Sequence, residues 1–310
     1  MVGAKGFTLV WFFALTILAA CDGSDNGMEA ADSRKKSSNS KDNAKSFSSL
    51  CEDCEDEAIS SSSSAGGWVS SSNLESFDWS IPKENYLNPE ITYGTMTDSR
   101  DGQTYKTVKI GEQVWMAENL NYADSTKTPS LLKRSWCYDD KAENCAVAGR
   151  LYTWAAAIDS AELYKDKSID CGDGKTCTLP DTVYGICPPG WHLPTRTEWK
   201  TLLDEVGGLS TASKILKSQT GWYNNGNGTD GVGFSALPAG GWDVGNGEFY
   251  AGGRLANFWS ASGEDSHSAY HMDLSYEDDH ANLTGYYKKE DVIHDCLSNQ
   301  APHLCKQFCL

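Results

Sequence analysis

Positive charge is scarce in this sequence. Its 310 residues contain 26 Lys and Arg against 43 Asp and Glu, which gives a formal net charge of -17. Because binding to nucleic-acid phosphates needs a basic surface, the composition argues against nucleic acid as a partner. An acidic surface suits solubility, calcium or neutral partners such as glycans, and charge alone does not choose among them.

Local signatures of catalysis are also missing. No G-x-S-x-G elbow singles out one serine as a nucleophile. Glycoside hydrolysis needs two carboxylates that flank a cleft, and no pattern selects a pair among Glu118, Glu198, Asp243, Glu248 and Asp273. We therefore expect a domain without enzymatic activity and without a cofactor; the alternative is an extracellular enzyme that acts on polysaccharide or protein.

The N-terminus has the layout of a bacterial export signal. Lys5 precedes the apolar run FTLVWFFALTILAA and then Cys21, a run too short for a spanning helix with a folded flank. Leu18-Ala19-Ala20-Cys21 resembles a lipobox, in which the chain is cut before the cysteine and the thiol is lipidated. Since each buried methylene contributes about 0.8 kcal/mol, a multiply acylated Cys21 would hold the protein on a membrane.

We therefore expect residues 1–20 to be a signal peptide and Cys21 to be the lipidation site. The mature chain would then lie in the cell envelope, with the membrane as a partner through its lipid, at the outer membrane or the cell surface. The alternative is an ordinary secretory signal whose last residue happens to be cysteine.

Residues 21–88 lack the recurring apolar residues of helices and strands. Stretches such as SRKKSSNSKDNAKSFSSL and ISSSSSAGG bury too little apolar surface to offset the entropy of ordering. We expect a disordered, Ser-rich, acidic tether that holds the folded part away from the membrane. Within it, Cys51 and Cys54 form a C-x-x-C pair, but the neighbouring acids and the lack of a preceding strand oppose a redox role.

The cysteines outside Cys21 number ten, and an even number in an exported chain indicates disulfides. Short separations favour local pairing of 137 with 145 and of 171 with 177. Cys187 then needs a distant partner, for which Cys296 is our choice. The candidates for disulfides in the folded part are thus Cys137, Cys145, Cys171, Cys177, Cys187 and Cys296.

Residues 89–296 look like one folded domain. Apolar residues alternate on both sides of Gly111-Glu112, which predicts a hairpin over 108–116. An apolar stripe at helical spacing predicts a helix over 149–159, formed by Leu151, Trp154, Ala155 and Ile158. Thr195 and Glu198 have the spacing of a capping box, which predicts a second helix over 195–206 that ends at Gly207-Gly208.

Beyond about residue 220 the sequence is rich in glycine and aromatic residues. Gly-Asn and Asp-Gly pairs mark turns, and FSALP, FYAG and FWSAS have the composition of brief strands. We expect an α+β architecture in which two helices lie beside a small, mainly antiparallel, loop-rich and disulfide-bonded sheet.

Several motifs in a fixed order resemble one known family. They are DGQTYKTVKIGEQVWMAENLNY, WCYDD, NCAVAGRLYTWAAA, GICPPGWHLPTRTEW, GFSALPAGGW and FWSAS, and together they resemble the Fibrobacter succinogenes major paralogous domain over about residues 90–296. That family is grouped with C-type-lectin-like folds, and its LPT-x-x-EW stretch is similar to that of the sulfatase-modifying enzymes. Family members are commonly exported or lipid-anchored, so the resemblance implies a fold and a location outside the cytoplasm. It does not imply a particular reaction.

The chain departs from the family pattern at its end. The family domain closes on a strand like SVRCV, whose cysteine would pair with the one before PPGWHLP; this resemblance also implies the pair Cys187–Cys296. Here DVIHDCLSNQAPHLCKQFCL keeps Val292 and Cys296 but lacks the arginine. Either the last strand has diverged or the end is a degenerate extension, and we assign 297–310 to a divergent Cys/His tail. The EPN, QPD and WND motifs of calcium-dependent lectins and the Cys-x4-Cys of formylglycine-generating enzymes do not occur.

Metal ligation has two weak candidates, and no metal is expected. Even spacing places three side chains on one face of a predicted strand, namely His267, His271 and Asp273, with Asp278-Asp279-His280 after them. A second group near the end has zinc-type ligands without a recognised zinc spacing, and an oxidising compartment favours disulfides there: His294, Cys296, His303, Cys305 and Cys309.

Aromatic residues are the strongest remaining indication of function. Four tryptophans lie on helix stripes or beside strand-like pieces and are expected in the core, namely Trp115, Trp154, Trp199 and Trp259. Four other residues lie among Gly, Asn and Asp, where a ring can stack on a sugar or anchor a protein: Trp222, Trp242, Phe249 and Tyr250. The alternative is that such rings anchor loops. We expect a surface-displayed binding or structural domain, with glycans or envelope proteins as partners, and assign no role to Trp191 and His192.

Overall fold

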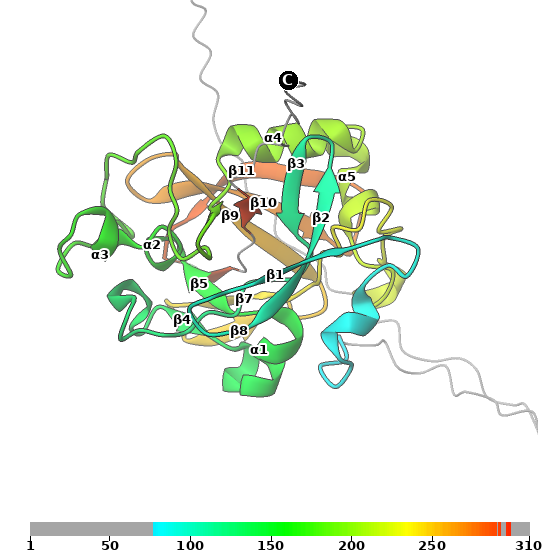
Figure 1. The fold of residues 1–310 in the computed structure, drawn as a ribbon, viewed down its shortest axis with the longest axis horizontal. Helices are drawn as coiled ribbons and strands as arrows, with labels where there is room; N and C mark the ends of the chain where they lie inside the picture. The colour runs from blue at the N-terminus through cyan, green and yellow to red at the C-terminus, as the bar shows by residue number, and fades with distance from the viewer. Residues whose placement is uncertain (1–76, 290, 293–295, 299–310) are drawn as a thin grey trace, which may run out of the picture. The chain divides into compact units, whose positions relative to one another are not determined.

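Three short antiparallel sheets form the scaffold of the protein in a computed structural model (Figure 1), which describes residues 77–289, 291, 292 and 296–298. The first sheet has the strand order β1 (Gly94–Thr97), β2 (Thr104–Ile110), β3 (Gln113–Met116), β13 (Leu297–Ser298) and β6 (Trp191–His192). The second has the order β4 (Ser135–Trp136), β5 (Leu151–Thr153), β12 (Asp291–Val292), β7 (Gly241–Asp243) and β8 (Glu248–Tyr250). The third has the order β11 (Ala281–Tyr287), β10 (Ser268–Ser275) and β9 (Leu255–Gly263).

Five α-helices accompany these sheets in the described part, where the sequence predicted two. They are α1 (Ala142–Ala148), α2 (Trp154–Ala157), α3 (Ser160–Leu163), α4 (Arg196–Glu205) and α5 (Leu209–Leu216). Short 3-10 turns add η1 (Lys83–Tyr86), η2 (Pro129–Leu131), η3 (Tyr138–Asp140) and η4 (Tyr223–Asn225). Helix α4 packs on the three strands of the third sheet and α5 packs on β11, while α1 contacts η1 and η3 and lies at the lower end of the view (Figure 1). The predicted α+β class with small antiparallel sheets is confirmed.

Helix α4 begins at the capping box that the sequence predicted. The Thr195 hydroxyl accepts a hydrogen bond from the Glu198 amide at 3.2 Å, and the Thr195 amide donates to Glu198 Oε2 at 2.8 Å. These bonds satisfy amides that the first turn leaves without a helical partner. The expected apolar stripe is buried, with Trp199 and Leu202 fully enclosed, and Gly207 ends the helix at a φ of 95°.

The predicted helix over 149–159 is wrong in its first half. Leu151–Thr153 forms strand β5, which pairs with β4, and the helix starts only at Trp154, where Thr153 accepts a hydrogen bond from the Ala156 amide at 3.2 Å. Residues 151–161 are all buried. A segment enclosed on every side has no polar face, so an apolar stripe at helical spacing could not distinguish helix from strand there.

The hairpin over 108–116 is confirmed. Strands β2 and β3 pair in register, with Val108 opposite Trp115, around a turn in which Gly111 has a φ of 57°. The segment FSALP, expected to be a strand, makes only an isolated bridge between Ala236 and Lys217.

All three expected disulfides are present. They join Cys137 to Cys145, Cys171 to Cys177, and Cys187 to Cys296, with Cα separations of 5.0, 5.8 and 5.8 Å. The last of them closes a stretch of 109 residues. It sits beside β13, whose Leu297 pairs with both Trp115 and His192. The folded domain therefore continues past residue 296, into the first two residues of the segment 297–310 that was assigned to a divergent tail.

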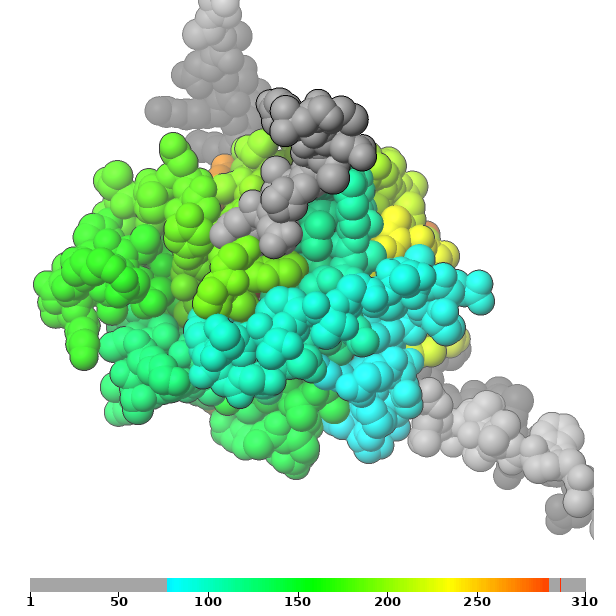
Figure 2. Space-filling model, in the orientation of Figure 1, coloured from blue at the N-terminus to red at the C-terminus, as the bar shows by residue number. Residues whose placement is uncertain are grey.

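The described chain starts inside the segment expected to be a tether. Phe77 and Tyr86 are each 2% exposed, and their rings stack with centroids 5.1 Å apart. The space-filling view shows this cyan N-terminal part lying flush against the rest of the domain (Figure 2). The folded part therefore reaches back at least to Phe77, because the aromatic residues of FDWSIPKENY supply apolar surface that the serine-rich stretch lacks.

Aromatic residues dominate the core. The four tryptophans expected there, Trp115, Trp154, Trp199 and Trp259, are at most 1% exposed. Trp115 stacks on Trp199 at 4.7 Å, and the indole of Trp199 donates to the Trp259 carbonyl at 3.2 Å. These contacts tie α4 to the first and third sheets.

Candidate binding site

Five aromatic side chains from three distant parts of the chain form a continuous row, which we call the aromatic row: Trp136, Trp242, Phe249, Tyr138 and Trp79. Successive rings along it lie 5.7, 4.4, 5.1 and 4.8 Å apart, distances typical of favourable aromatic pairs. Every member is partly exposed. At one end of the row, the ring centroid of Trp79 lies 4.6 Å from that of the buried Phe77, so this end packs against the core.

The local backbone explains why these rings meet. Hairpin β7–β8 places Trp242 directly opposite Phe249. Trp136 and Tyr138 flank Cys137, whose disulfide to Cys145 holds the segment against α1. The Tyr138 hydroxyl accepts a hydrogen bond from the Gly252 amide at 3.2 Å, and a Cβ at Gly252 would lie only 2.6 Å from the tyrosine ring. Burial raises the pKa of Tyr138, which keeps its hydroxyl neutral.

Polar groups border the row. The β7–β8 hairpin carries Asp243, which is half-buried, and Asn246 and Glu248, which are exposed; Asp139, next to Tyr138, is exposed as well. Rings stack on the apolar faces of sugars, while carboxylates and amides accept or donate hydrogen bonds to hydroxyls. The arrangement therefore has the two kinds of contact that a glycan-binding surface uses.

The sequence candidates have different positions relative to this row. Trp242 and Phe249 belong to it. Tyr250 is half-buried beside it, with its hydroxyl hydrogen-bonded to that of Tyr286 at 2.8 Å. Trp222 does not belong to it: only 4% of this residue is exposed, and its indole donates to the Ser218 hydroxyl and the Ala236 carbonyl. Trp222 is thus a loop anchor, and its assignment as a ligand-binding candidate is corrected.

Sequence reasoning missed the other members of the row. Trp136 and Tyr138 are two residues apart in an extended segment, a spacing that places both side chains on one side. Trp79 lies in the segment that was expected to be tether. The aromatic residues on both sides of Cys137 could have suggested Trp136 and Tyr138. Their place in the row depends on Trp242 and Phe249, which are more than 100 residues away in the sequence, and no local pattern predicts such a contact.

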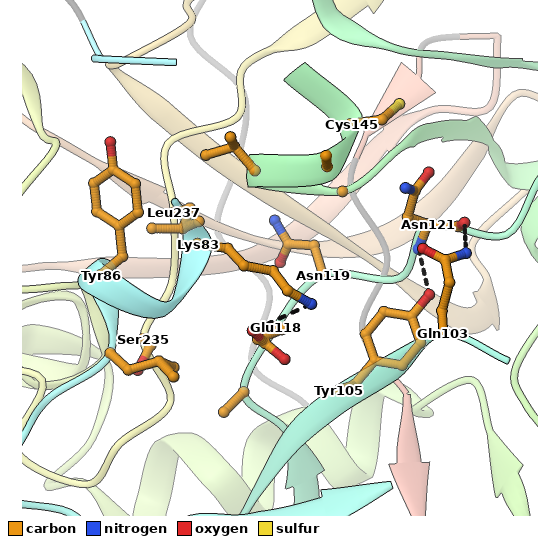
Figure 3. A pocket seen from close by; sticks show the side chains of 15 residues that line it. Lys83, Tyr86, Gln103, Tyr105, Glu118, Asn119, Asn121, Cys145, Ser235 and Leu237 are labelled. Carbon is orange, nitrogen blue, oxygen red and sulfur yellow. Dashed lines mark hydrogen bonds and ion pairs between the residues drawn. The ribbon is translucent and has the colours of Figure 1, made fainter. Parts of the chain in front are cut away.

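A polar slot lies beside η1 (Figure 3). Lys83 reaches from η1 to Glu118, whose Oε1 is 3.3 Å from its ammonium. Gln103 donates to the Asn121 carbonyl at 2.6 Å, and the Asn121 amide donates to the Tyr105 hydroxyl at 3.1 Å. The free space is about 20 Å³, which is room for roughly one water molecule. These groups bind one another, so the slot joins η1 to the first sheet and has no room for a ligand.

The three residues weighed as metal-ligand candidates, His267, His271 and Asp273, do not converge on one point. His267 lies 2.8 Å from an oxygen of Asp173, whereas His271 is 3% exposed, donates to the Thr284 carbonyl at 3.1 Å and lies 3.3 Å from Asp273. A bulge between Ala269 and His271 interrupts the alternation on which the prediction depended. Burial raises the pKa of Asp273, but the hydrogen bonds from His271 and Asn282 outweigh it and leave the value below normal.

Within the described part of the chain, no three His, Cys, Asp or Glu side chains gather as a metal site would require. Other sequence candidates lie outside the described residues: the lipidation candidate Cys21, the pair Cys51 and Cys54, and the terminal residues His294, His303, Cys305 and Cys309.

Trp191 and His192, which had no assigned role, form β6 and are 7% and 8% exposed. His192 Nε2 is 2.9 Å from Glu198 Oε1, while the other Glu198 oxygen caps α4. Burial raises the pKa of Glu198, but the bonds from His192 and Thr195 outweigh this effect and lower it. Because both of its carboxylate oxygens are hydrogen-bonded, Glu198 has a structural role at the start of α4.

The comparisons with known proteins complete this description. A family model described as the Fibrobacter succinogenes major domain matches residues 108–300. No curated protein and no solved structure matches the chain. Among the helices of residues 77–298 that the structure describes, none has the length and apolar character needed to span a bilayer.

Proposed function

The chain belongs to the Fibrobacter succinogenes major domain family, and from this membership and the aromatic row we propose that it is a surface-displayed lipoprotein whose domain binds glycans without catalysis. The observation that carries the proposal is the row itself. Five partly exposed rings, held in fixed contact and bordered by carboxylates and an amide, form an extended platform. An extended platform suits a chain of sugar units better than a single small molecule.

The negative charge of the chain favours a neutral glycan over an anionic partner. The chain has a formal net charge of -17, and the exposed side chains beside the row include Asp139 and Glu248. A neutral polysaccharide meets no electrostatic penalty at such a surface, whereas an acidic one is repelled. We therefore propose neutral polysaccharides as the ligand class.

Trp242→Ala is expected to weaken binding to a neutral polysaccharide about tenfold, because it removes the ring that contacts both Trp136 and Phe249 and hot-spot aromatics contribute more than about 1 kcal/mol. Affinity electrophoresis of the full chain in detergent would measure this, with soluble xylan, glucomannan and xyloglucan in the gel. A pull-down with insoluble cellulose adds a crystalline substrate.

Tyr184→Ala is the matched control, since Tyr184 is an aromatic residue outside the row with 59% of its surface exposed. It is expected to bind like the native chain. The proposal fails if the native chain is retained by none of these polysaccharides, or if Trp242→Ala and Tyr184→Ala bind equally well while both remain folded by tryptophan fluorescence.

We also propose that Cys21 carries the lipid that anchors the chain in the cell envelope, with residues 1–20 as the signal peptide. The lipobox-like sequence before Cys21 supports this. Cys21→Ser is expected to move most of the protein from the membrane fraction to the soluble fraction, because the acylated thiol is lost. Fractionation followed by immunoblotting measures the shift, and an unchanged distribution would refute the anchor.

The finer fold assignment is a proposal as well. We propose that the domain is C-type-lectin-like, which the family membership, the short antiparallel sheets and the long-range disulfide support. Superposing an experimentally determined structure on C-type lectin domains would test it.

A further inference from the structure

A hollow of about 320 Å³ opens beside the N-terminus of α4. Its wall combines the loop around Asp181, the cap residue Thr195, the end of β9 at Ser262 and the turn at Glu264-Asp265, with Trp154 and Lys288 also lining it. This volume falls in the range of small-molecule sites, about 300–1,000 Å³. None of these residues belongs to the aromatic row, so the hollow, which we call the Lys288 pocket, is a separate feature.

Lys288 is part of the pocket wall, and its side chain is held in place by hydrogen bonds. It is 2% exposed, and its ammonium donates to the carbonyls of Lys175 at 3.0 Å, Asp265 at 2.6 Å and Ser266 at 3.5 Å. It also lies 4.6 Å from the centre of the Trp154 ring. Burial lowers the pKa of Lys288, which the nearby carboxylates of Asp265 and Asp173 partly oppose. Since its three donors are engaged by carbonyls, this ammonium has none left for an anionic ligand.

Glu264 lines the pocket, and its carboxylate lies close to Gly285 of β11. A Cβ on Gly285 would collide with the Glu264 carboxylate, so the glycine leaves the space in which that carboxylate lies. Glu264 and Asp181 are both exposed, and in the described part of the chain neither carboxylate has a hydrogen bond or an ion pair. By contrast, Asp265 accepts hydrogen bonds from the amides of His267 and Ser268 at 2.7 Å.

The balance of charges selects the ligand class. Three acidic residues, Asp181, Glu264 and Asp265, line the pocket, and its one ammonium is already bound by carbonyls, so an anionic ligand is repelled. The hydroxyls of Thr195 and Ser262 add polar groups to the lining, and the Trp154 ring adds an apolar one. We propose that the Lys288 pocket binds a small molecule with a protonated primary amine, of amino-sugar size, whose ammonium pairs with Glu264 and Asp181.

The proposal is tested with three primary amines, namely glucosamine, galactosamine and ethanolamine, each compared with its N-acetylated form. Binding to the full chain in detergent is measured by microscale thermophoresis at low ionic strength. At least one amine is expected to bind, and its N-acetylated form, which lacks the charge, is expected to bind at least about tenfold more weakly.

Two variants test whether the Glu264 carboxylate binds the amine. Glu264→Gln removes the charge, and Gly285→Ala displaces the same carboxylate without changing a residue of the lining; each is expected to weaken the bound amine about tenfold. Tyr184→Ala, outside both the aromatic row and the pocket lining, is expected to leave amine binding unchanged. Glu264→Gln is expected to leave polysaccharide binding unchanged, so a failure here is distinguishable from failure of the glycan proposal. The proposal is overturned if no amine binds, if the acetylated forms bind equally, or if both variants, folded by thermal melting, bind like the native chain.

Discussion

Replacing both cysteines of the long-range disulfide, Cys187→Ser with Cys296→Ser, is expected to lower the free energy of unfolding by about 5 kcal/mol. The bond closes 109 residues, and closing a long loop removes much conformational entropy from the unfolded chain. Both cysteines are buried, at 6% and 0% exposure, so the serines would also place hydroxyls in an apolar setting. Urea unfolding followed by tryptophan fluorescence under non-reducing conditions measures the loss.

The double substitution Cys137→Ser with Cys145→Ser provides the comparison, since that bond closes only 8 residues. The same loop-closure relation predicts a loss of about 2.5 kcal/mol, roughly half as large. Equal losses for the two double variants, or a larger loss for the short loop, would show that loop length does not govern the contribution of these bonds.

Lys217→Ala is expected to lower the free energy of unfolding by about 2–5 kcal/mol, the range for truncating a large buried side chain to alanine. Lys217 is 1% exposed, and its ammonium donates to the carbonyls of Ser275 at 2.8 Å and Asp278 at 2.9 Å. It also lies 5.2 Å from the Trp222 ring. The truncation would leave two carbonyls without their donor and open a cavity beneath α5.

Lys200→Ala is the control for this variant. Its ammonium pairs with Asp204 on the surface of α4, with 67% of the lysine side chain exposed, and such pairs contribute at most about 1 kcal/mol. Urea denaturation of both variants gives the comparison. A Lys217→Ala protein as stable as Lys200→Ala would mean that the buried ammonium contributes nothing to holding the β10–β11 turn.

The elements that the sequence predicted well are those whose signals are local. The capping box of Thr195 and Glu198 needs only four consecutive residues, and the hairpin around Gly111 needs only a turn between two alternating segments. The local disulfides followed from short separations in the same way. The family resemblance supplied the long-range pair Cys187–Cys296, which local reasoning alone could only suggest.

The errors occurred where tertiary packing decides the outcome. Residues 151–161 are buried on all sides, so their spacing did not reveal that Leu151 lies on a strand. Trp222 lies in a glycine-rich segment, yet its indole finds two buried acceptors and the ring packs inward. The aromatic row joins residue 79 to residues 136–138 and 242–249, and such convergence depends on the whole fold. Of the four binding candidates, only Trp242 and Phe249 are members of it.

Strand β13 has a consequence for how the domain forms. It lies between β3 and β6 in the first sheet, although among the described strands it comes last in the sequence. The gap between β3 and β6 therefore cannot be filled until the chain as far as residue 298 is available, and contacts over such long separations form slowly. The domain stays open at this gap until β13 takes its place, and the bond from Cys187 to Cys296 then fixes the end of the described chain beside β6.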